Sequence, residues 1–125
     1  MLLKIDFNSD EAIYMQLRNQ IIVGIATSEI RDGESLPSVR DLAETLGINM
    51  HTVNKSYALL RQEGYLKLDR RRGAVVSVSP DKMRATMEML EEMKVVVAKG
   101  ICRGITREEA LQMVDEIYRY YGTEE

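Results

Sequence analysis

The spacing between two short amphipathic segments in the middle of the chain constrains the fold more than any other feature. The first segment follows Ser38 and ends at Gly47, and only Ile48 separates that glycine from Asn49, a favourable N-cap for the next helix. Its apolar stripe consists of Val39, Leu42, Ala43 and Leu46. Two short helices joined by about three residues that include a glycine are typical of a helix-turn-helix.

The helices on both sides of this turn have clear local signals. Ser38 is a good N-cap, and Asp41, three residues later, can bond back to its amide as in a capping box. In the second helix, over residues 50–63, we expect Val53, Tyr57 and Leu60 to face inward. Upstream, residues 11–28 predict another helix, for which Ser9 and Asp10 are candidate caps; its apolar residues at four-residue intervals are Ile13, Leu17, Ile21 and Ile25.

The hydrophobic period changes after the third predicted helix. Residues 65–68 and 74–78 alternate between apolar and polar side chains, and residues 69–73 between them contain three consecutive arginines followed by Gly73. This pattern predicts a β-hairpin with a basic tip, and Pro80 closes the segment. Three helices and a hairpin in this order predict a winged helix-turn-helix, a mainly α fold with a small β-hairpin wing, over residues 1–78.

Residues 79–125 predict two further helices. The first covers residues 81–99 and ends at a break over 100–104, and the second begins at Thr106, which forms a capping-box pattern with Glu109. We expect their apolar faces to be buried in a helical dimerisation element, because two helices cannot cover both faces alone. A flexible methionine surface for an effector is the alternative. The predicted dimerisation residues are Met83, Met87, Leu90, Met93, Val97, Leu111, Val114 and Ile117.

The distribution of charge favours a nucleic-acid partner, although the net charge of −3 does not. Residues 35–78 carry 7 basic and 4 acidic side chains, a net charge of +3, whereas residues 1–34 (3 basic, 6 acidic) and 79–125 (7 basic, 10 acidic) are each at −3. A local basic footprint of this kind suits the phosphates of DNA. In the predicted geometry the helix over 50–63 enters the major groove.

The central residues resemble the DNA-binding domain of the GntR family of bacterial transcription regulators. The resemblance covers about residues 7–78 and includes Ile13-Tyr14 and Gln16-Leu17 in the first helix. It rests on the run from Gly33 to Gly47 (GESLPSVRDLAETLG), and continues with Asn49, Thr52-Val53, Tyr57, Leu60, the run Glu63 to Leu66, and Arg72-Gly73. The short helical tail resembles the YtrA branch of that family, whose tails serve in dimerisation.

The resemblance implies roles for individual residues. Arg40 would contact a phosphate or a guanine edge, Arg72 would enter or grip the minor groove, and Gly73 would let the wing backbone approach the DNA. Many relatives carry arginine where this chain has Met50 and Asn54, so a different base preference is expected. The full set of predicted DNA-binding residues is Arg40, Met50, His51, Thr52, Asn54, Lys55, Arg70, Arg71, Arg72 and Gly73.

The predicted function is that of a cytoplasmic homodimeric repressor that binds double-stranded DNA at a palindromic operator. The resemblance adds an ABC-transporter operon as a target and an unidentified small-molecule effector as a further partner. With one histidine, one cysteine and no phosphate-binding glycine loop, the sequence predicts no enzyme, no metal site, no cofactor and no membrane segment. Two alternatives stay open: a winged helix that binds another protein, and a helical ligand-binding protein.

Overall fold

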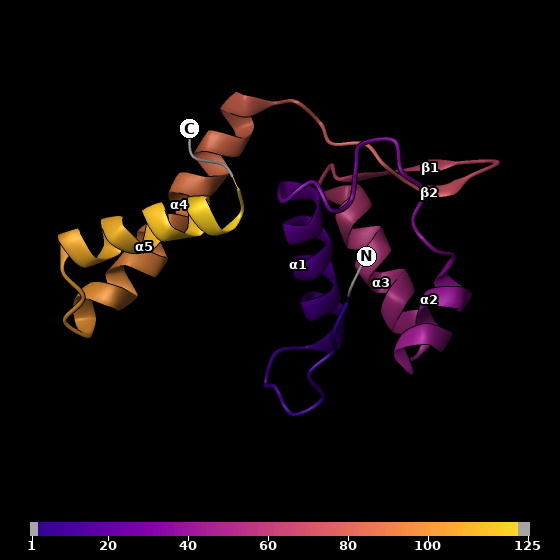
Figure 1. The fold of residues 1–125 in the computed structure, drawn as a ribbon, viewed down its shortest axis with the longest axis horizontal. Coiled ribbons are helices and arrows are strands. Elements are labelled where there is room, and N and C mark those ends of the chain that lie inside the picture. Colours follow the sequence, from indigo (N-terminus) through magenta and orange to yellow (C-terminus); the bar gives the residue numbers. More distant parts are fainter. Residues whose placement is uncertain (1–2, 123–125) are drawn as a thin grey trace. The chain divides into compact units, whose positions relative to one another are not determined.

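The computed structural model describes residues 3–122, and the chain divides after Ser79 into two compact units. The first unit contains three helices and a two-stranded antiparallel sheet, in the order α1 (Ile13–Ala26), α2 (Val39–Leu46), α3 (Met50–Gln62), β1 (Leu66–Asp69) and β2 (Gly73–Val76). The second unit contains α4 (Lys82–Cys102) and α5 (Arg107–Tyr120) (Figure 1). None of the described helices is both long and apolar enough to cross a membrane.

The core of the first unit is built around α3. This helix packs against α1, α2 and β1, so that one helix carries most of the packing between elements. Its inward residues Val53 and Leu60 are fully buried, and Tyr57 is nearly so, as the sequence predicted. The other core residues are Leu17, Ile21, Ile30, Leu36, Leu42, Ala43, Leu66 and Val76. The winged helix-turn-helix predicted from the sequence is therefore confirmed.

The start of α1 differs from the prediction. Neither Ser9 nor Asp10 caps the helix; the N-cap is Ala12, which provides no side-chain hydrogen bond. Instead the buried side chain of Gln16 fixes the incoming segment, because its Nε2 donates to the carbonyl of Asp6 (3.0 Å) and its Oε1 accepts from the Asp6 amide (2.9 Å). Gln16 thus anchors the segment that precedes the helix and does not cap the helix itself.

The wing is broader than the predicted hairpin. β1 and β2 pair with Leu66 opposite Val76, and the segment before α2 lies along the other side of β2. The amide of Leu36 donates to the Ala74 carbonyl and the amide of Val76 donates to the Glu34 carbonyl, both at 2.8 Å. This extra pairing joins the base of the wing to the loop that leads into α2, and no alternating pattern in residues 33–36 predicted it.

The turn between α4 and α5 also differs from the sequence prediction. α4 does not break at Gly100 but continues to Cys102, and Gly104, with a φ of +86°, reverses the chain. Gly100 is instead a close-packing position, because a β-carbon there would lie 3.4 Å from Cβ of Ile105. The predicted capping box of Thr106 is present.

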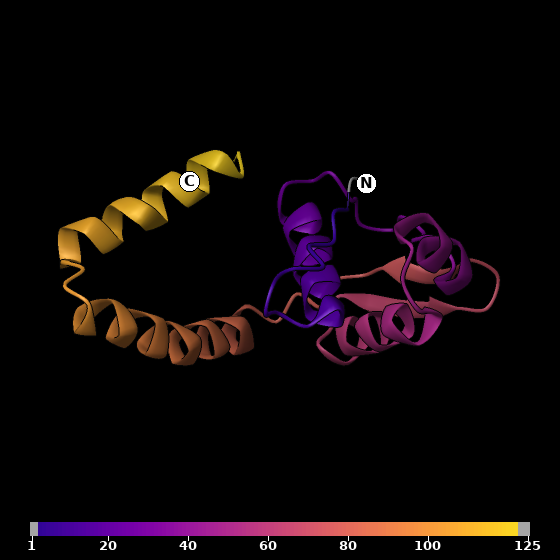
Figure 2. The ribbon, with the colours of Figure 1, turned by 90° about the horizontal axis from the view of Figure 1, so that it is seen from below.

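Within the second unit, α4 and α5 diverge from this turn, so that neither helix covers the other (Figure 2). No described residue of either helix is buried. The expectation that the last helix buries its apolar residues is therefore not met within one chain. All eight predicted dimerisation residues are exposed: Met83, Met87, Leu90, Met93, Val97, Leu111, Val114 and Ile117.

Candidate nucleic-acid interface

Two side-chain hydrogen bonds and one left-handed residue fix α2 and the turn that leads to α3. The hydroxyl of Ser38 accepts from the Asp41 amide (3.1 Å), although the return bond of the predicted capping box is not formed among the described residues. Gly47 ends α2 with a φ of +69°. The side chain of Asn49 accepts from the His51 amide at 2.7 Å and starts α3. These local contacts set the angle at which α3 leaves α2.

Two buried polar side chains hold α3 in place. Ser56 is fully buried, and its hydroxyl donates to the carbonyl of Tyr14 on α1 at 2.7 Å. Tyr57 donates to the Pro37 carbonyl at 2.8 Å, and burial raises the pKa of its hydroxyl far above the usual range, so it remains a neutral donor. The position of α3 is therefore fixed against both α1 and the segment that precedes α2.

The predicted base-reading residues lie on the first turns of α3. Met50, His51 and Asn54 are exposed, and at about 100° per residue they share one side of the helix. Thr52 points further round and is half-buried. Lys55 is the only Lys, Arg, Asp or Glu residue on these first turns.

Lys55 is exposed but not free of interactions. Its Nζ lies 3.9 Å from the centre of the Tyr14 ring, a cation–π contact between α3 and α1. The sequence predicted Lys55 only as a phosphate contact and gave no sign of this partner, because the two residues are 41 positions apart and meet only when α1 packs on α3.

The tip of the wing is organised by an aspartate. The Oδ1 atom of Asp69 accepts from the amides of Arg71 (2.8 Å) and Arg72 (3.0 Å), and these bonds, with Arg72 the first cause, lower the pKa of the carboxyl. Gly73 follows with a φ of +73°, which a residue with a side chain adopts only at a cost. The glycine expected to ease the approach to DNA is thus already required by the turn.

The arginines predicted at the interface have different surroundings. Arg40 lies exposed on the first turn of α2, and Arg70 and Arg71 are exposed at the wing tip. Arg72 instead donates through Nη2 to the carbonyl of Gly33, in the segment that borders β2. Arg72 therefore ties the wing tip to its base, a role that the sequence did not predict.

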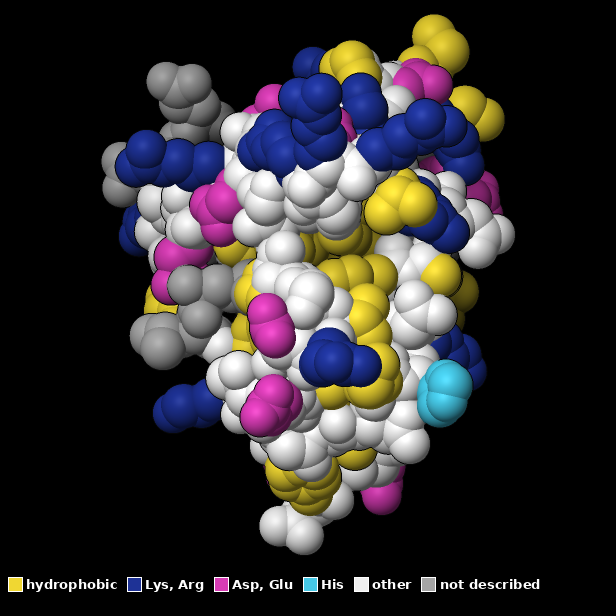
Figure 3. Space-filling view, turned by 90° about the vertical axis from the view of Figure 1, so that its right-hand side faces the viewer, with side chains coloured by type: hydrophobic (Ala, Val, Ile, Leu, Met, Phe, Trp, Pro, Cys, Tyr) yellow, Lys and Arg dark blue, Asp and Glu magenta, His cyan; other side chains and the backbone are white. Residues whose placement is uncertain are grey.

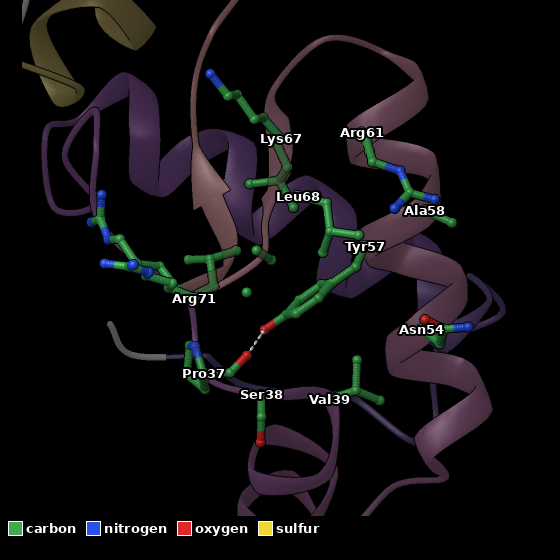
Figure 4. A pocket seen from close by; sticks show the side chains of 15 residues that line it. Pro37, Ser38, Val39, Asn54, Tyr57, Ala58, Arg61, Lys67, Leu68 and Arg71 are labelled. Carbon is green, nitrogen blue, oxygen red and sulfur yellow. Dashed lines mark hydrogen bonds between the residues drawn. The ribbon is translucent and has the colours of Figure 1, made fainter.

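A groove of about 450 Å³ runs between α3, the wing and the segment before α2 (Figure 4). Among its 15 lining residues are Asn54, Arg61, Lys67, Arg71 and Arg72, but no acidic residue. Arg61 and Lys67 lie outside the predicted interface; of the two basic residues on α3, the sequence favours a phosphate contact only for Lys55 and indicates an ordinary helix-surface charge at Arg61. On the face shown in Figure 3, Lys and Arg side chains gather above a hollow with a hydrophobic floor.

The described residues contain no group of three or more His, Cys, Asp or Glu side chains that could hold a metal ion. The arrangement instead presents a helix with exposed polar residues, a basic hairpin and a cationic groove between them. This geometry suits a helix in a major groove and a hairpin in the neighbouring minor groove of duplex DNA.

Comparisons with known proteins agree with this geometry. The family described as "Bacterial regulatory proteins, gntR family" matches residues 10–76. The HTH-type transcriptional regulator Rv1152 of Mycobacterium tuberculosis is 30% identical over 92% of this chain and 93% of its own length. The HTH-type transcriptional repressor YtrA of Bacillus subtilis is 29% identical, with 93% and 92% covered. YtrA from Sulfolobus acidocaldarius, a GntR-family transcription factor of known structure, is 33% identical, with a TM-score of 0.59 and 97% of this chain and all of that chain covered.

Proposed function

Because the chain belongs to the GntR family of bacterial transcription regulators, we propose that it is a homodimeric repressor that binds a palindromic operator in the cytoplasm. One observation carries the DNA-binding part of the proposal: α3 and the wing hold exposed polar and basic residues on the two sides of a groove that no acidic residue lines. The major groove of B-DNA admits one α-helix, and a hairpin fits the neighbouring minor groove.

The proposed DNA contacts follow from these positions. Met50, His51 and Asn54 would read base edges, and Asn54 is suited to a bidentate contact with adenine. Thr52, which is half-buried, would reach only a phosphate or a base at the edge of the helix face. The proposed phosphate and minor-groove contacts are Arg40, Lys55, Arg70, Arg71, Arg72 and Gly73.

The homodimer is supported by the second unit. An exposed apolar face along two helices that bury nothing against each other is costly in water, and pairing of two copies removes it. A two-fold axis through the paired tails would place two α3 helices about 34 Å apart, on one face of the duplex, and would make the operator a palindrome.

The proposal goes beyond DNA binding in two respects, repression and the genes that are regulated. They are supported by the similarity to the Bacillus subtilis repressor YtrA, which extends through the tail. We propose that the regulated genes include an ABC-transporter operon. An effector would act on the tail, change the distance between the two α3 helices, and so lower the operator affinity.

The experiment that tests DNA binding uses fluorescently labelled intergenic DNA from upstream of the chain's own gene, across a salt series. Wild-type protein should bind one palindromic fragment tightly, and the affinity should fall steeply with salt. The variant Arg70→Glu/Arg71→Glu should lose this binding. These two arginines are preferable to Arg72, whose guanidinium bonds to Gly33 and helps to shape the wing.

A matched control is available in the second unit. Lys99→Glu/Arg103→Glu changes the net charge by the same amount at exposed positions near the α4–α5 turn, and Lys99 lies about 200° round α4 from Val97 of the predicted dimer face. It should keep operator binding. Weak binding to every fragment, equal in wild type and both variants, would refute the DNA-binding proposal and direct attention to a protein partner.

A further inference from the structure

The last turns of α5 carry a shallow pocket that the proposed DNA contacts do not use. It has a volume of about 450 Å³ and is lined by Met113, Glu116, Ile117, Tyr120 and Tyr121. Small-molecule sites in proteins commonly have volumes of about 300–1,000 Å³. Since α4 diverges from α5 at the turn that joins them, α4 does not cover this part of the helix (Figure 2).

The pocket lies beside the predicted dimer seam and not on it. At about 100° per residue, Tyr120 lies about 120° round α5 from Val114 of the seam, and Glu116 lies about 160° from it. Ile117, about 60° from Val114, belongs to both the pocket and the seam. Tyr120 is 86% exposed. Pairing of two copies through the seam therefore leaves the pocket open, and a ligand in it touches the edge of the seam.

Most of the pocket lining is apolar and polarisable. The ring centres of Tyr120 and Tyr121 lie 5.8 Å apart with an angle of 54° between the planes, so the two rings present π-faces in different directions. The face of an aromatic ring is negative and attracts cations. Met113 adds a flexible thioether that adapts to irregular ligands. Such a lining suits a ligand with an apolar body and a positive charge.

The acidic group of the pocket is the carboxylate of Glu116, and its charge is not compensated. Its Oε1 accepts a hydrogen bond from Nε2 of Gln112 at 3.2 Å, and it takes part in no ion pair within residues 3–122. Arg119 follows in the same turns of α5 but pairs with Asp115 at 3.0 Å. The carboxylate of Glu116 is therefore available to a positively charged ligand.

Two fields of longer range have the same sign as this carboxylate. Tyr120 is the last residue of α5, and the C-terminal end of a helix carries a partial negative charge. Residues 79–125 carry 7 basic and 10 acidic side chains, a net charge of −3. A metal ion does not fit this lining, because hard cations take several oxygen ligands and the pocket offers one carboxylate among apolar groups.

We propose that this pocket binds a lipophilic organic cation, a quaternary ammonium, a phosphonium or a protonated amine with an aromatic or aliphatic body. The charged centre lies between Glu116 and Tyr120, and the apolar body covers Met113 and Ile117. The inference rests on the proposed function in one respect, since it names the chemical class of the effector that acts on the tail. Through Ile117 the cation reaches the edge of the dimer seam and changes the spacing of the two α3 helices.

The test of binding uses two ions of the same shape and opposite charge. Calorimetric titration of the full chain with tetraphenylphosphonium should show one site per chain. Tetraphenylborate has the same four phenyl groups and should bind at least about ten-fold more weakly, because the carboxylate and the helix end repel an anion. Equal affinities for the two ions, or no binding of tetraphenylphosphonium at about 1 mM, would overturn the inference.

Variants then separate the site from the net charge of the tail. Glu116→Gln keeps the size of the side chain and should weaken phosphonium binding about five-fold. Tyr120→Leu should weaken it about two- to five-fold, whereas Tyr120→Phe keeps the π-face and should bind like wild type. Glu92→Gln removes the same charge at an exposed position of α4 and should have no effect. An equal loss in Glu92→Gln and Glu116→Gln would refute a site at this pocket.

Methionine methyl groups locate the bound ion independently of any substitution. With ¹³C-labelled ε-methyl groups, saturation with tetraphenylphosphonium should shift the signal of Met113 through the ring currents of the probe. The signal of Met83, in the first turn of α4, should not move. A shift at Met83 that exceeds the shift at Met113 would place the ion on the predicted dimer face of α4 and overturn the inference.

The role as effector has its own readout. Saturating tetraphenylphosphonium should lower the operator affinity of wild type by about five-fold or more, and that of Glu116→Gln less at the same concentration. If the cation binds in the pocket but the operator affinity does not change, the assignment of the effector class is wrong. If wild type binds no operator in the absence of the cation, the proposed function fails, and the calorimetry still decides whether the pocket binds cations.

Discussion

The hydroxyl of Tyr57, in the middle of α3, donates a hydrogen bond of 2.8 Å to the backbone carbonyl of Pro37. The donor belongs to the helix proposed to read DNA, and the acceptor belongs to the segment that leads into α2 (Figure 4). The bond therefore links the two helices of the helix-turn-helix across the floor of the groove, independently of the turn that joins them in sequence.

Replacement of Tyr57 by phenylalanine tests this link. The ring and its packing remain, but the Pro37 carbonyl loses its partner in a partly buried place, so the free energy of unfolding should fall by about 1 kcal/mol. Urea unfolding of wild type and variant measures the difference. Tyr65→Phe is the control, because no hydrogen bond of the Tyr65 hydroxyl occurs within the described residues; an equal loss in both variants would contradict the prediction.

Replacement of Gly24 by alanine should destabilise the protein, against the usual helix preference. In an exposed helix this change is worth about 1 kcal/mol in favour of alanine. Here a β-carbon would lie 2.7 Å from Cδ1 of Ile30, which is buried, so overpacking should cost about 1–3 kcal/mol. The double variant Gly24→Ala/Ile30→Val, which lacks that methyl group, should lose less than the sum of the single changes. Additive losses in thermal unfolding would argue against the contact.

The wing tip should respond to acid through Asp69. The pKa of this carboxyl is lowered because the ionised form accepts hydrogen bonds from the Arg72 and Arg71 amides. A folded pKa below the unfolded value of about 3.9 means that the stabilisation is complete above that pH and is lost as the pH falls through the folded pKa. The amide chemical shifts of Arg71 and Arg72 should therefore titrate with a midpoint below about 3.9. Asp69→Asn should abolish the titration; a midpoint at or above the ordinary value would refute the prediction.

The tail should lose its self-association when a charge is placed on the exposed apolar face of α4. Leu90→Arg puts a guanidinium at the centre of the proposed seam, where it cannot be paired without cost. Sedimentation equilibrium should show wild type as a dimer and the variant as a monomer at micromolar concentration. Glu92→Arg introduces the same side chain two residues on, about 200° round the helix, and should remain dimeric. A monomeric wild type would refute the proposed homodimer.

Local signals in the sequence predicted the central elements well. The bounds of α2 and α3 follow from Ser38, Gly47 and Asn49, whose effects extend only over a turn of helix. Two helix boundaries predicted from local signals were wrong. At the start of α1, Ser9 and Asp10 do not cap the helix and the buried side chain of Gln16 holds the preceding segment, and α4 continues through Gly100 to Cys102.

The sequence by itself determined the order of elements, the helix-turn-helix, the basic hairpin and the family, because caps, periodicity and turn residues act between neighbours in the chain. Only the tertiary structure placed Lys55 on Tyr14, joined Arg72 to Gly33 and brought Arg61 and Lys67 to one groove. Such contacts join residues on different elements. They depend on packing angles that no local pattern records, and here those angles are set by the core around α3.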